Sequence, residues 1–309
     1  MDELVAAARG LAVDAVTAET VTALRAADVR PIVLKGPAIA GLLYQGEPRA
    51  YVDTDLLVRP GDIAAARRVL GDLGFAEQPL RIEPELGRPH ARAWVREADR
   101  AEVDLHELVA GAGVSPEKLW TTLHPHTQAL RIGGVDCRVP APHALVLIVA
   151  LHAAQHGPDV VKPLEDLGRA VARIEYGTWL DAVRLADALD ATVNFASALR
   201  FTPEGSALAE RLGLPSPRLV DAARSTRSPA GLALGFERLA AARGLGDRLA
   251  LLRRELVPSP EHMRWWSGLA RRGRAGLTVA YVWRLLRLAV LTPSSVVLWA
   301  RERRRMRDA

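Results

Sequence analysis

Residues 49–58 read RAYVDTDLLV and contain two aspartates separated by one residue. The apolar residues around them and the turn residues that follow predict a strand from Tyr51 to Val58. Alternate side chains of a strand face opposite sides, so Asp53 and Asp55 point the same way, about 7 Å apart. Two like charges held together are unfavourable unless a cation lies between them. Magnesium suits such a pair because it takes hard oxygen ligands and keeps places for phosphate oxygens and water.

A third acid lies in a second short strand, predicted over residues 102–107. Alternation along the segment VDLH puts Asp104 and His106 on one face of that strand. Asp104 can then share a metal with Asp53 and Asp55 and act as a base toward an attacking hydroxyl. Paired aspartates are also frequent on solvent-exposed strand edges. The metal site therefore depends on the three carboxylates converging from two separate strands.

Lys35 and Gly36 lie where a buried strand, predicted over residues 32–34, turns into a helix. Pro37 suits the first turn of that helix, which is predicted to run to about Tyr44. Amide groups at a helix N-terminus favour phosphate, glycine permits close approach, and Lys35 adds a positive charge. An ordinary strand-to-helix turn has the same pattern, so this segment does not establish a phosphate site by itself.

The remaining pattern predicts an α+β domain over residues 1–140 and a helical domain over 141–309. Helices are predicted over 2–27 and 62–73, a hairpin over 91–96 and 102–107, and a strand pair around Gly133 and Gly134. Beyond residue 140 nearly every segment has helical periodicity. The helices there are predicted over 141–156, 161–175, 178–189, 192–200 and 204–212.

Several short motifs, in this order, resemble the uncharacterised nucleotidyltransferase family of the polymerase-β-like superfamily. The motifs are LKG at 34–36, Arg49, DTDLLV at 53–58, VDLH at 103–106, LHAAQH at 151–156 and Lys162. The resemblance covers roughly residues 30–200. It implies a nucleotidyltransferase fold, in which a small mixed β-sheet is flanked by helices and followed by an all-helical C-terminal domain.

The resemblance also implies a reaction, in which a nucleoside monophosphate passes from an NTP to a hydroxyl and pyrophosphate leaves. Mg²⁺ or Mn²⁺ would be held by Asp53, Asp55 and Asp104, which are the predicted catalytic residues. The predicted contacts to the NTP are Lys35, Gly36, Arg49, Lys162 and His106. A plain surface ion pair between Lys162 and Asp166 is an equally good interpretation of those two residues.

Two positions depart from the family pattern. The wider superfamily usually has a Gly-Ser pair in its phosphate turn, whereas this sequence has Gly36 and Pro37, so the serine contact is missing. Thr54 replaces the isoleucine that is common between the two aspartates, which directs one hydroxyl toward the core. Neither change touches the acids.

His152 and His156 share one face of a predicted helix because they lie four residues apart. Gln155 stands where a zincin motif would carry glutamate, so that zinc motif is absent. A structural or interdomain hydrogen-bonding role is favoured over metal binding, and His152 could still reach the cleft.

Composition limits the class of protein. The chain has 309 residues, of which 49% are hydrophobic and 25% charged, as in soluble proteins of two domains. The single Cys137 excludes an intrachain disulfide and a multi-cysteine zinc site, which fits a reducing cytoplasm. The N-terminus MDELVAAARG carries acids where a signal peptide has basic residues, so a cytoplasmic location is expected.

The charge is distributed unevenly. Residues 264–309 carry eleven arginines and two acids, a net charge of +9, which leaves −4 for the remainder of a chain whose total is +5. The acidic remainder favours a small-molecule or peptide acceptor over nucleic acid, although the basic tail keeps nucleic acid open. Arg284, Arg287 and Pro293 interrupt the apolar residues of 277–300, so no transmembrane segment is expected.

Two other functions remain open at this point. The fold could serve as a non-catalytic nucleotide-binding module, or the basic tail could make the protein an adaptor for nucleic acid or a membrane surface. The presence of all three acids favours the enzyme. The acceptor, the base preference and the oligomeric state are not determined by the sequence.

Overall fold

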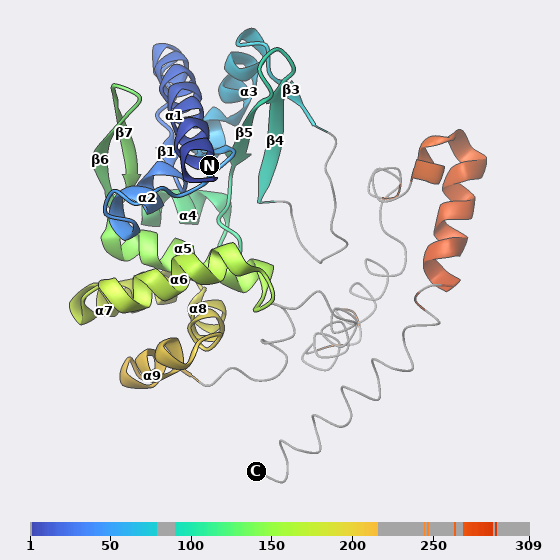
Figure 1. Ribbon diagram of the computed structural model, residues 1–309. Coiled ribbons are helices and arrows are strands. Elements are labelled where there is room, and N and C mark those ends of the chain that lie inside the picture. The colour runs from blue at the N-terminus through green and yellow to red at the C-terminus, as the bar shows by residue number, and fades with distance from the viewer. Residues whose placement is uncertain are drawn as a thin grey trace. The chain divides into compact units, whose positions relative to one another are not determined.

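The computed structural model describes residues 2–78, 90–215, 244, 246, 263, 268–286 and 288. The chain divides into two compact units, the first made of Met1–Gln78 and Pro89–Ser216, the second of Pro79–Arg88 and Pro217–Ala309. In the first unit a mixed sheet is covered by helices, and helices α5 to α9 gather at one end of the sheet (Figure 1). The expected α+β class is confirmed.

The helices of the first unit are α1 (Asp2–Ala26), α2 (Pro37–Leu43), α3 (Ile63–Asp72), α4 (Pro116–Leu123), α5 (Pro142–His156), α6 (Val161–Arg173), α7 (Tyr176–Ala188), α8 (Thr192–Leu199) and α9 (Pro203–Arg211), with a 3-10 turn at Pro60–Asp62. The strands are β1 (Ile32–Val33), β2 (Thr54–Leu57), β3 (Ala76–Glu77), β4 (Ala91–Arg96), β5 (Ala101–His106), β6 (Thr127–Ile132) and β7 (Val135–Pro140). Most of these elements match the predicted ranges, whereas β3 and α4 were not predicted.

The sheet has seven strands in the order β3-β4-β5-β2-β1-β7-β6. β2 pairs with β5 in parallel, β1 pairs with β7 in parallel, and the other neighbours are antiparallel. The predicted hairpin between β4 and β5 and the predicted pair around Gly133 are both present. Because β5 returns beside β2, the two strands that carry the predicted acids lie next to each other.

β2 begins at Thr54 and not at the predicted Tyr51, so Asp53 lies in a bend immediately before the strand. The Tyr51 hydroxyl donates to Asp14 on α1 at 2.8 Å. The Tyr51 ring lies so close to Gly36 that a Cβ there would meet it at 3.4 Å. The segment before Asp53 is therefore anchored to α1 and to the Gly36 turn, and it does not extend the β2 ladder.

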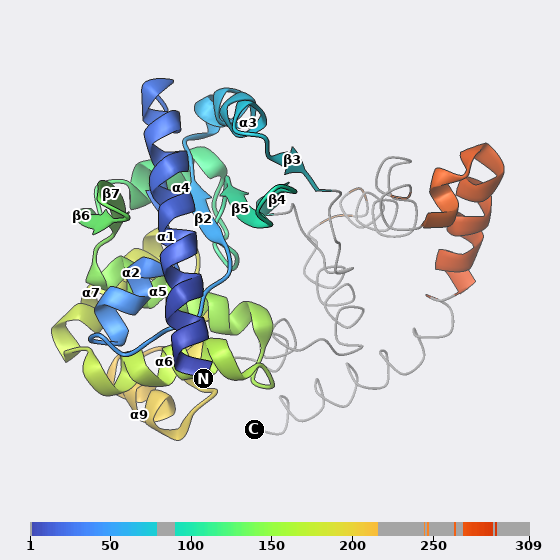
Figure 2. The ribbon, with the colours of Figure 1, turned by 45° about the horizontal axis from the view of Figure 1, so that its top comes forward.

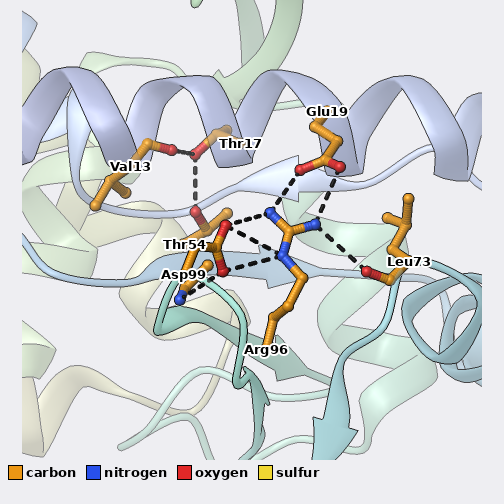
Figure 3. A network of polar contacts seen from close by, with 8 residues as sticks. Val13, Thr17, Glu19, Thr54, Leu73, Arg96 and Asp99 are labelled. Carbon is orange, nitrogen blue, oxygen red and sulfur yellow. Dashed lines mark hydrogen bonds and ion pairs between the residues drawn. The ribbon is translucent and has the colours of Figure 1, made fainter.

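One face of the sheet is covered by α1, which crosses in front of the strands in Figure 2 and contacts β2, β6 and β7. Two buried threonines meet at this interface (Figure 3). The Thr17 hydroxyl donates to the Val13 carbonyl at 2.8 Å, so the Thr54 hydroxyl donates to Thr17 at 2.9 Å. The hydroxyl between the two aspartates thus has a partner in the core.

Arg96 of β4 secures the same side of the sheet (Figure 3). Its guanidinium donates to Glu19 of α1 at 2.9 and 3.0 Å and to Asp99 in the β4–β5 turn at 2.7 Å. These charge-assisted bonds tie the hairpin that carries Asp104 to the helix that packs under β2.

Replacing Thr17 with valine is expected to lower the free energy of unfolding by about 1–3 kcal/mol, because the buried Thr54 hydroxyl then lacks an acceptor. The double variant Thr17→Val/Thr54→Val removes both hydroxyls and is expected to be nearly as stable as the wild type. Urea unfolding measures both. A double variant less stable than Thr17→Val would contradict this account of the pair.

Helix α5 forms the centre of the helical half. Ten of its residues are buried, and it packs against α6, α7 and α8. A helix that is apolar on all sides must be enclosed in this way. Although α5 begins where the helical domain was expected, α5 to α9 belong to the same compact unit as the sheet. The domain boundary near Pro140 stays a prediction.

The described part of the second unit contains a 3-10 turn at Gly268–Arg271 and helical residues 273–286. Met263, Ala270 and Ala280 form its small buried cluster. Among the described residues, no helix is long and apolar enough to cross a membrane. The basic residues 301–309 lie outside the described part of the chain.

Candidate active site

The parallel register of β2 and β5 brings two of the predicted acids together. Asp55 and Asp104 lie directly beside each other in this register, so their side chains leave the sheet on the same side, opposite the face covered by α1. His106 follows Asp104 on that face. One carboxylate oxygen from each aspartate and one ring nitrogen of His106 all lie within 4.8 Å of one another.

Asp55 is the best-held residue of this group. Its Oδ1 lies 2.7 Å from the Lys35 ammonium and 2.9 Å from His106 Nε2, and its side chain is only 3% exposed. Burial would raise the pKa of Asp55, but Lys35 and His106 outweigh it and hold the pKa well below its ordinary value. Asp55 is therefore a fixed carboxylate. Both contacts use Oδ1, so Oδ2 is the oxygen that can bind a cation without displacing them.

The pKa values of Asp53 and Asp104 are shifted in the opposite direction to that of Asp55. Burial and the neighbouring Asp55 raise the pKa of Asp53 to about 6. Burial, with a contribution from Asp55, also raises the pKa of Asp104. Asp53 does not belong to the compact group of three, but Asp104 and Asp55 both act on its charge. The site thus concentrates more negative charge than its own cations neutralise.

This donor set fits a divalent metal ion. Two closely spaced carboxylates, with a third acid beside them, are oxygen ligands of the kind that Mg²⁺ and Mn²⁺ take. His106 Nε2 lies 2.9 Å from Asp55 Oδ1, and Nδ1 lies 3.3 Å from the Leu108 carbonyl. Because the Asp55 carboxylate can only accept, the shorter contact is donated by Nε2–H. Imidazole suits Mn²⁺ better than Mg²⁺ as a direct ligand. With Mg²⁺, His106 acts by orienting Asp55.

Comparison with known proteins agrees with this geometry. The model of a family described as an uncharacterised nucleotidyltransferase matches residues 2–204, which is more than half of the 309 residues. The chain belongs to this nucleotidyltransferase family. The resemblance drawn from the sequence motifs is thereby confirmed.

Two solved structures resemble this chain more weakly. One is the antibiotic-resistance factor ANT(2'')-Ia, with 14% identity and a TM-score of 0.40, covering 59% of this chain and 91% of that one. The other is an antigenic nucleotidyltransferase-like protein from Paracoccidioides brasiliensis, with 15% identity and a TM-score of 0.35, covering 59% and 93%. A search of curated proteins finds no match.

The Gly36 turn has a conformation that glycine alone adopts readily, with φ 54° and ψ −112°. This turn has fewer free N–H donors than a helix N-terminus usually has. Pro37 has no N–H, and the Ala38 N–H is bound to the Lys35 carbonyl. The positive charge of this turn therefore comes from the Lys35 side chain.

Arg49 is buried, with 8% of its surface exposed, and two of its nitrogens are bound to Asp166 on α6. The predicted direct contact between Arg49 and a nucleotide is not tested by this geometry. Asp166 itself is 1% exposed, so the alternative of a surface ion pair between Lys162 and Asp166 is wrong. Residue spacing alone did not reveal that Asp166 has a partner 117 positions earlier.

Lys162 is exposed near the start of α6. Partial desolvation and the nearby Arg49 lower the pKa of Lys162, whereas Asp166, Glu165 and Asp53 oppose that shift. Lys162 thus lies within electrostatic range of Asp53. Its contact with a triphosphate stays a prediction.

A small cavity of ≈ 20 Å³ lies beside Lys35 and His106, with room for about one water molecule. Lys35, His106, His152 and Gln155 line it, together with His90, which sequence reasoning did not single out. Burial and the charge of Lys35 lower the pKa of His152 well below its ordinary value. His152 therefore lines the same cavity as Lys35 and His106 as a neutral side chain.

A larger hollow of ≈ 520 Å³ lies between α6 and α9 and contains none of the predicted site residues. Glu102 is a fourth acid that the sequence analysis missed. It occupies the same face of β5 as Asp104, two residues away, and its charge also raises the pKa of Asp53. The alternation of β5 could have identified it.

The affinity of the protein for Mg²⁺ is expected to fall as the pH decreases below about 6. Metal ligands must be deprotonated, and raised pKa values at Asp53 and Asp104 let protons compete with the metal. Each carboxylate that becomes protonated lowers the apparent affinity for Mg²⁺ by up to about tenfold per pH unit. Calorimetric titration with Mg²⁺ at pH 5, 6 and 7.5 measures this, with circular dichroism as the control for folding. An affinity that is constant across this range would refute it.

Proposed function

We propose that this protein transfers a nucleoside monophosphate from an NTP to a hydroxyl group of a small-molecule or peptide acceptor, with Mg²⁺ or Mn²⁺ bound at Asp53, Asp55 and Asp104. The observation that carries the proposal is the convergence of Asp55, Asp104 and His106 on adjacent parallel strands, within 4.8 Å, in a chain of a nucleotidyltransferase family.

In the proposed reaction the acceptor oxygen forms a bond to the α-phosphorus as the bond to the bridging oxygen of the β-phosphate breaks. Pyrophosphate leaves, and Asp104 accepts the proton of the acceptor hydroxyl. The raised pKa of Asp104 supports this role, because a base works best when its pKa approaches the operating pH. A bound divalent cation would supply neutralisation of the phosphate charge during this displacement.

The chain's own residues would position the NTP. Lys35, already beside Asp55, provides positive charge for the phosphates, and Gly36 allows their close approach. Lys162 would meet the triphosphate from α6. His106 keeps Asp55 oriented through the 2.9 Å contact between Nε2 and Oδ1.

The test is a panel of the four NTPs with Mg²⁺ or Mn²⁺ and pooled acceptors, in which pyrophosphate release and the mass of modified acceptors are measured. We expect release that requires NTP, metal and acceptor together. Metal-dependent NTP binding without release from any acceptor would favour a non-catalytic nucleotide-binding module. Absence of metal-dependent binding for all four NTPs would refute the proposal.

A further inference from the structure

Three side chains, Tyr44, Arg49 and Asp166 of α6, form one buried polar cluster near the Gly36 turn. Asp166 of α6 accepts hydrogen bonds from Arg49 Nε at 2.9 Å, from Arg49 Nη2 at 2.6 Å and from the Tyr44 hydroxyl at 2.7 Å. Tyr44 ends α2, the helix that starts after Gly36, and is 3% exposed. A carboxylate from the helical half is thus bound by two residues, Tyr44 and Arg49, that follow the predicted phosphate turn in the chain.

The geometry of this cluster specifies an orientation. Arg49 meets Asp166 with two parallel hydrogen bonds, an arrangement that fixes angle as well as distance. The third guanidinium nitrogen, Nη1, lies 3.5 Å from the Gly36 carbonyl. Arg49 therefore connects the backbone of the turn to α6, and Lys162 stands one helical turn before Asp166 on that helix.

Stability alone does not explain such a cluster. Well-packed apolar residues usually stabilise a fold as much as a buried ion pair does, whereas removing one partner is strongly destabilising. The segment after α2, which carries Arg49, is also joined to α6 by exposed ion pairs. In these, Glu47 binds Arg169 at 2.8 Å and Arg173 at 2.9 Å. The buried pair of Arg49 and Asp166 therefore adds a defined geometry to a contact that the exposed ion pairs already make.

We infer that Arg49 and Asp166 are positioning residues, which hold the first turn of α6, and with it Lys162, at a fixed place relative to Lys35 and Gly36. This inference rests on the proposed function, because it states how the two lysines come to face one triphosphate. It assigns Arg49 an indirect role instead of the direct nucleotide contact expected from the sequence.

The direction in which loss of Asp166 changes polyphosphate binding distinguishes a positioning role from a simple charge effect. Asp166 is an anion, so its removal would strengthen polyphosphate binding if only charge mattered. If Asp166 positions α6, its removal weakens binding. We expect Asp166→Asn and Arg49→Met each to weaken the binding of inorganic tripolyphosphate with Mg²⁺ by about tenfold. Lys162→Met is expected to add little to either variant, because Lys162 is already displaced.

A double variant distinguishes positioning from a purely structural role. Arg49→Met and Asp166→Leu singly are expected to lower the Tm by about 10 °C, and the double variant is expected to recover most of that loss. Binding of tripolyphosphate, measured by calorimetry, should stay weakened in the double variant. Recovery of both quantities would show a structural role only, and weakening by Arg49→Met without weakening by Asp166→Asn would show a direct contact. Either result overturns the inference.

The matched control is Glu47→Gln, which breaks the exposed pairs between the same elements and should change binding less than about twofold. Hydrogen exchange of residues 34–44 and 161–167 provides a readout that needs no ligand. Asp166→Asn should speed exchange in both segments. If the wild type binds no polyphosphate but exchange rises in both, the proposed function fails while the physical link stands; unchanged exchange refutes the link itself.

Discussion

Replacing Asp55 with asparagine is expected to lower the free energy of unfolding of the metal-free protein by about 3–5 kcal/mol. The Asp55 carboxylate is 3% exposed and accepts from Lys35 at 2.7 Å and from His106 at 2.9 Å. A neutral amide would leave the Lys35 ammonium largely buried without its counter-charge. It would also direct a donor or a weaker acceptor at His106.

The matched variant is Asp53→Asn, which is expected to have the opposite sign at pH 7.5. The pKa of Asp53 is raised to about 6, so folding favours its protonated form. That contribution to stability is present at acidic pH and is lost as the pH rises through about 6, where the carboxylate must ionise in the folded protein. Asparagine avoids this ionisation and is expected to raise the free energy of unfolding by roughly 1–3 kcal/mol.

Urea unfolding of both variants in EDTA measures this contrast between two residues on the same segment. Equal destabilisation by both would mean that the contacts of Lys35 and His106 do not favour ionised Asp55 over ionised Asp53. Destabilisation by Asp53→Asn alone would reverse the electrostatic account of the site.

The second large effect concerns metal and turnover. Asp53→Asn is expected to abolish stabilisation of the fold by Mg²⁺ and to lower nucleotide transfer by on the order of 10³-fold, because metal ions contribute several kcal/mol to such transfers. In the wild type, Mg²⁺ at about 100 times its Kd should raise the free energy of unfolding by about 2.7 kcal/mol. The variant that is more stable without metal is thus the one that gains nothing from it.

Thermal unfolding with and without Mg²⁺ and pyrophosphate release measure the two halves of this prediction. Asp72→Asn is the matched control, since Asp72 is an exposed acid on α3. It should keep the metal response and the turnover of the wild type. If Asp53→Asn transfers nucleotide as well as the wild type does, the assignment of Asp53 to the metal site is wrong.

The local periodicity of the sequence was sufficient for most of the secondary structure. The alternation of β5 correctly placed Asp104 and His106 on one face, and the apolar run of α5 marked a buried helix. Period and turn residues depend on near neighbours in the chain, which is why such elements can be predicted from sequence. The short β3 carries too few residues for such a pattern to be visible.

The boundary of β2 and the partner of Arg49 could not be predicted in this way. The strand starts late because Tyr51 binds Asp14 on α1, a contact across 37 positions. Arg49 binds Asp166 across 117 positions. Neither contact leaves a periodic signal, because each depends on how separate elements pack and not on the spacing of residues within one element.

The sequence by itself determined the acids, their spacing within each strand and the family to which their motifs belong, because these are properties of short segments. Only the tertiary structure decided that β5 pairs in parallel with β2, that Lys35 and His106 share one oxygen of Asp55, and that Asp53 lies outside the compact group. The physical reason is that electrostatic interactions depend on distances in space. Those distances are set by strand register and helix packing between segments far apart in the chain.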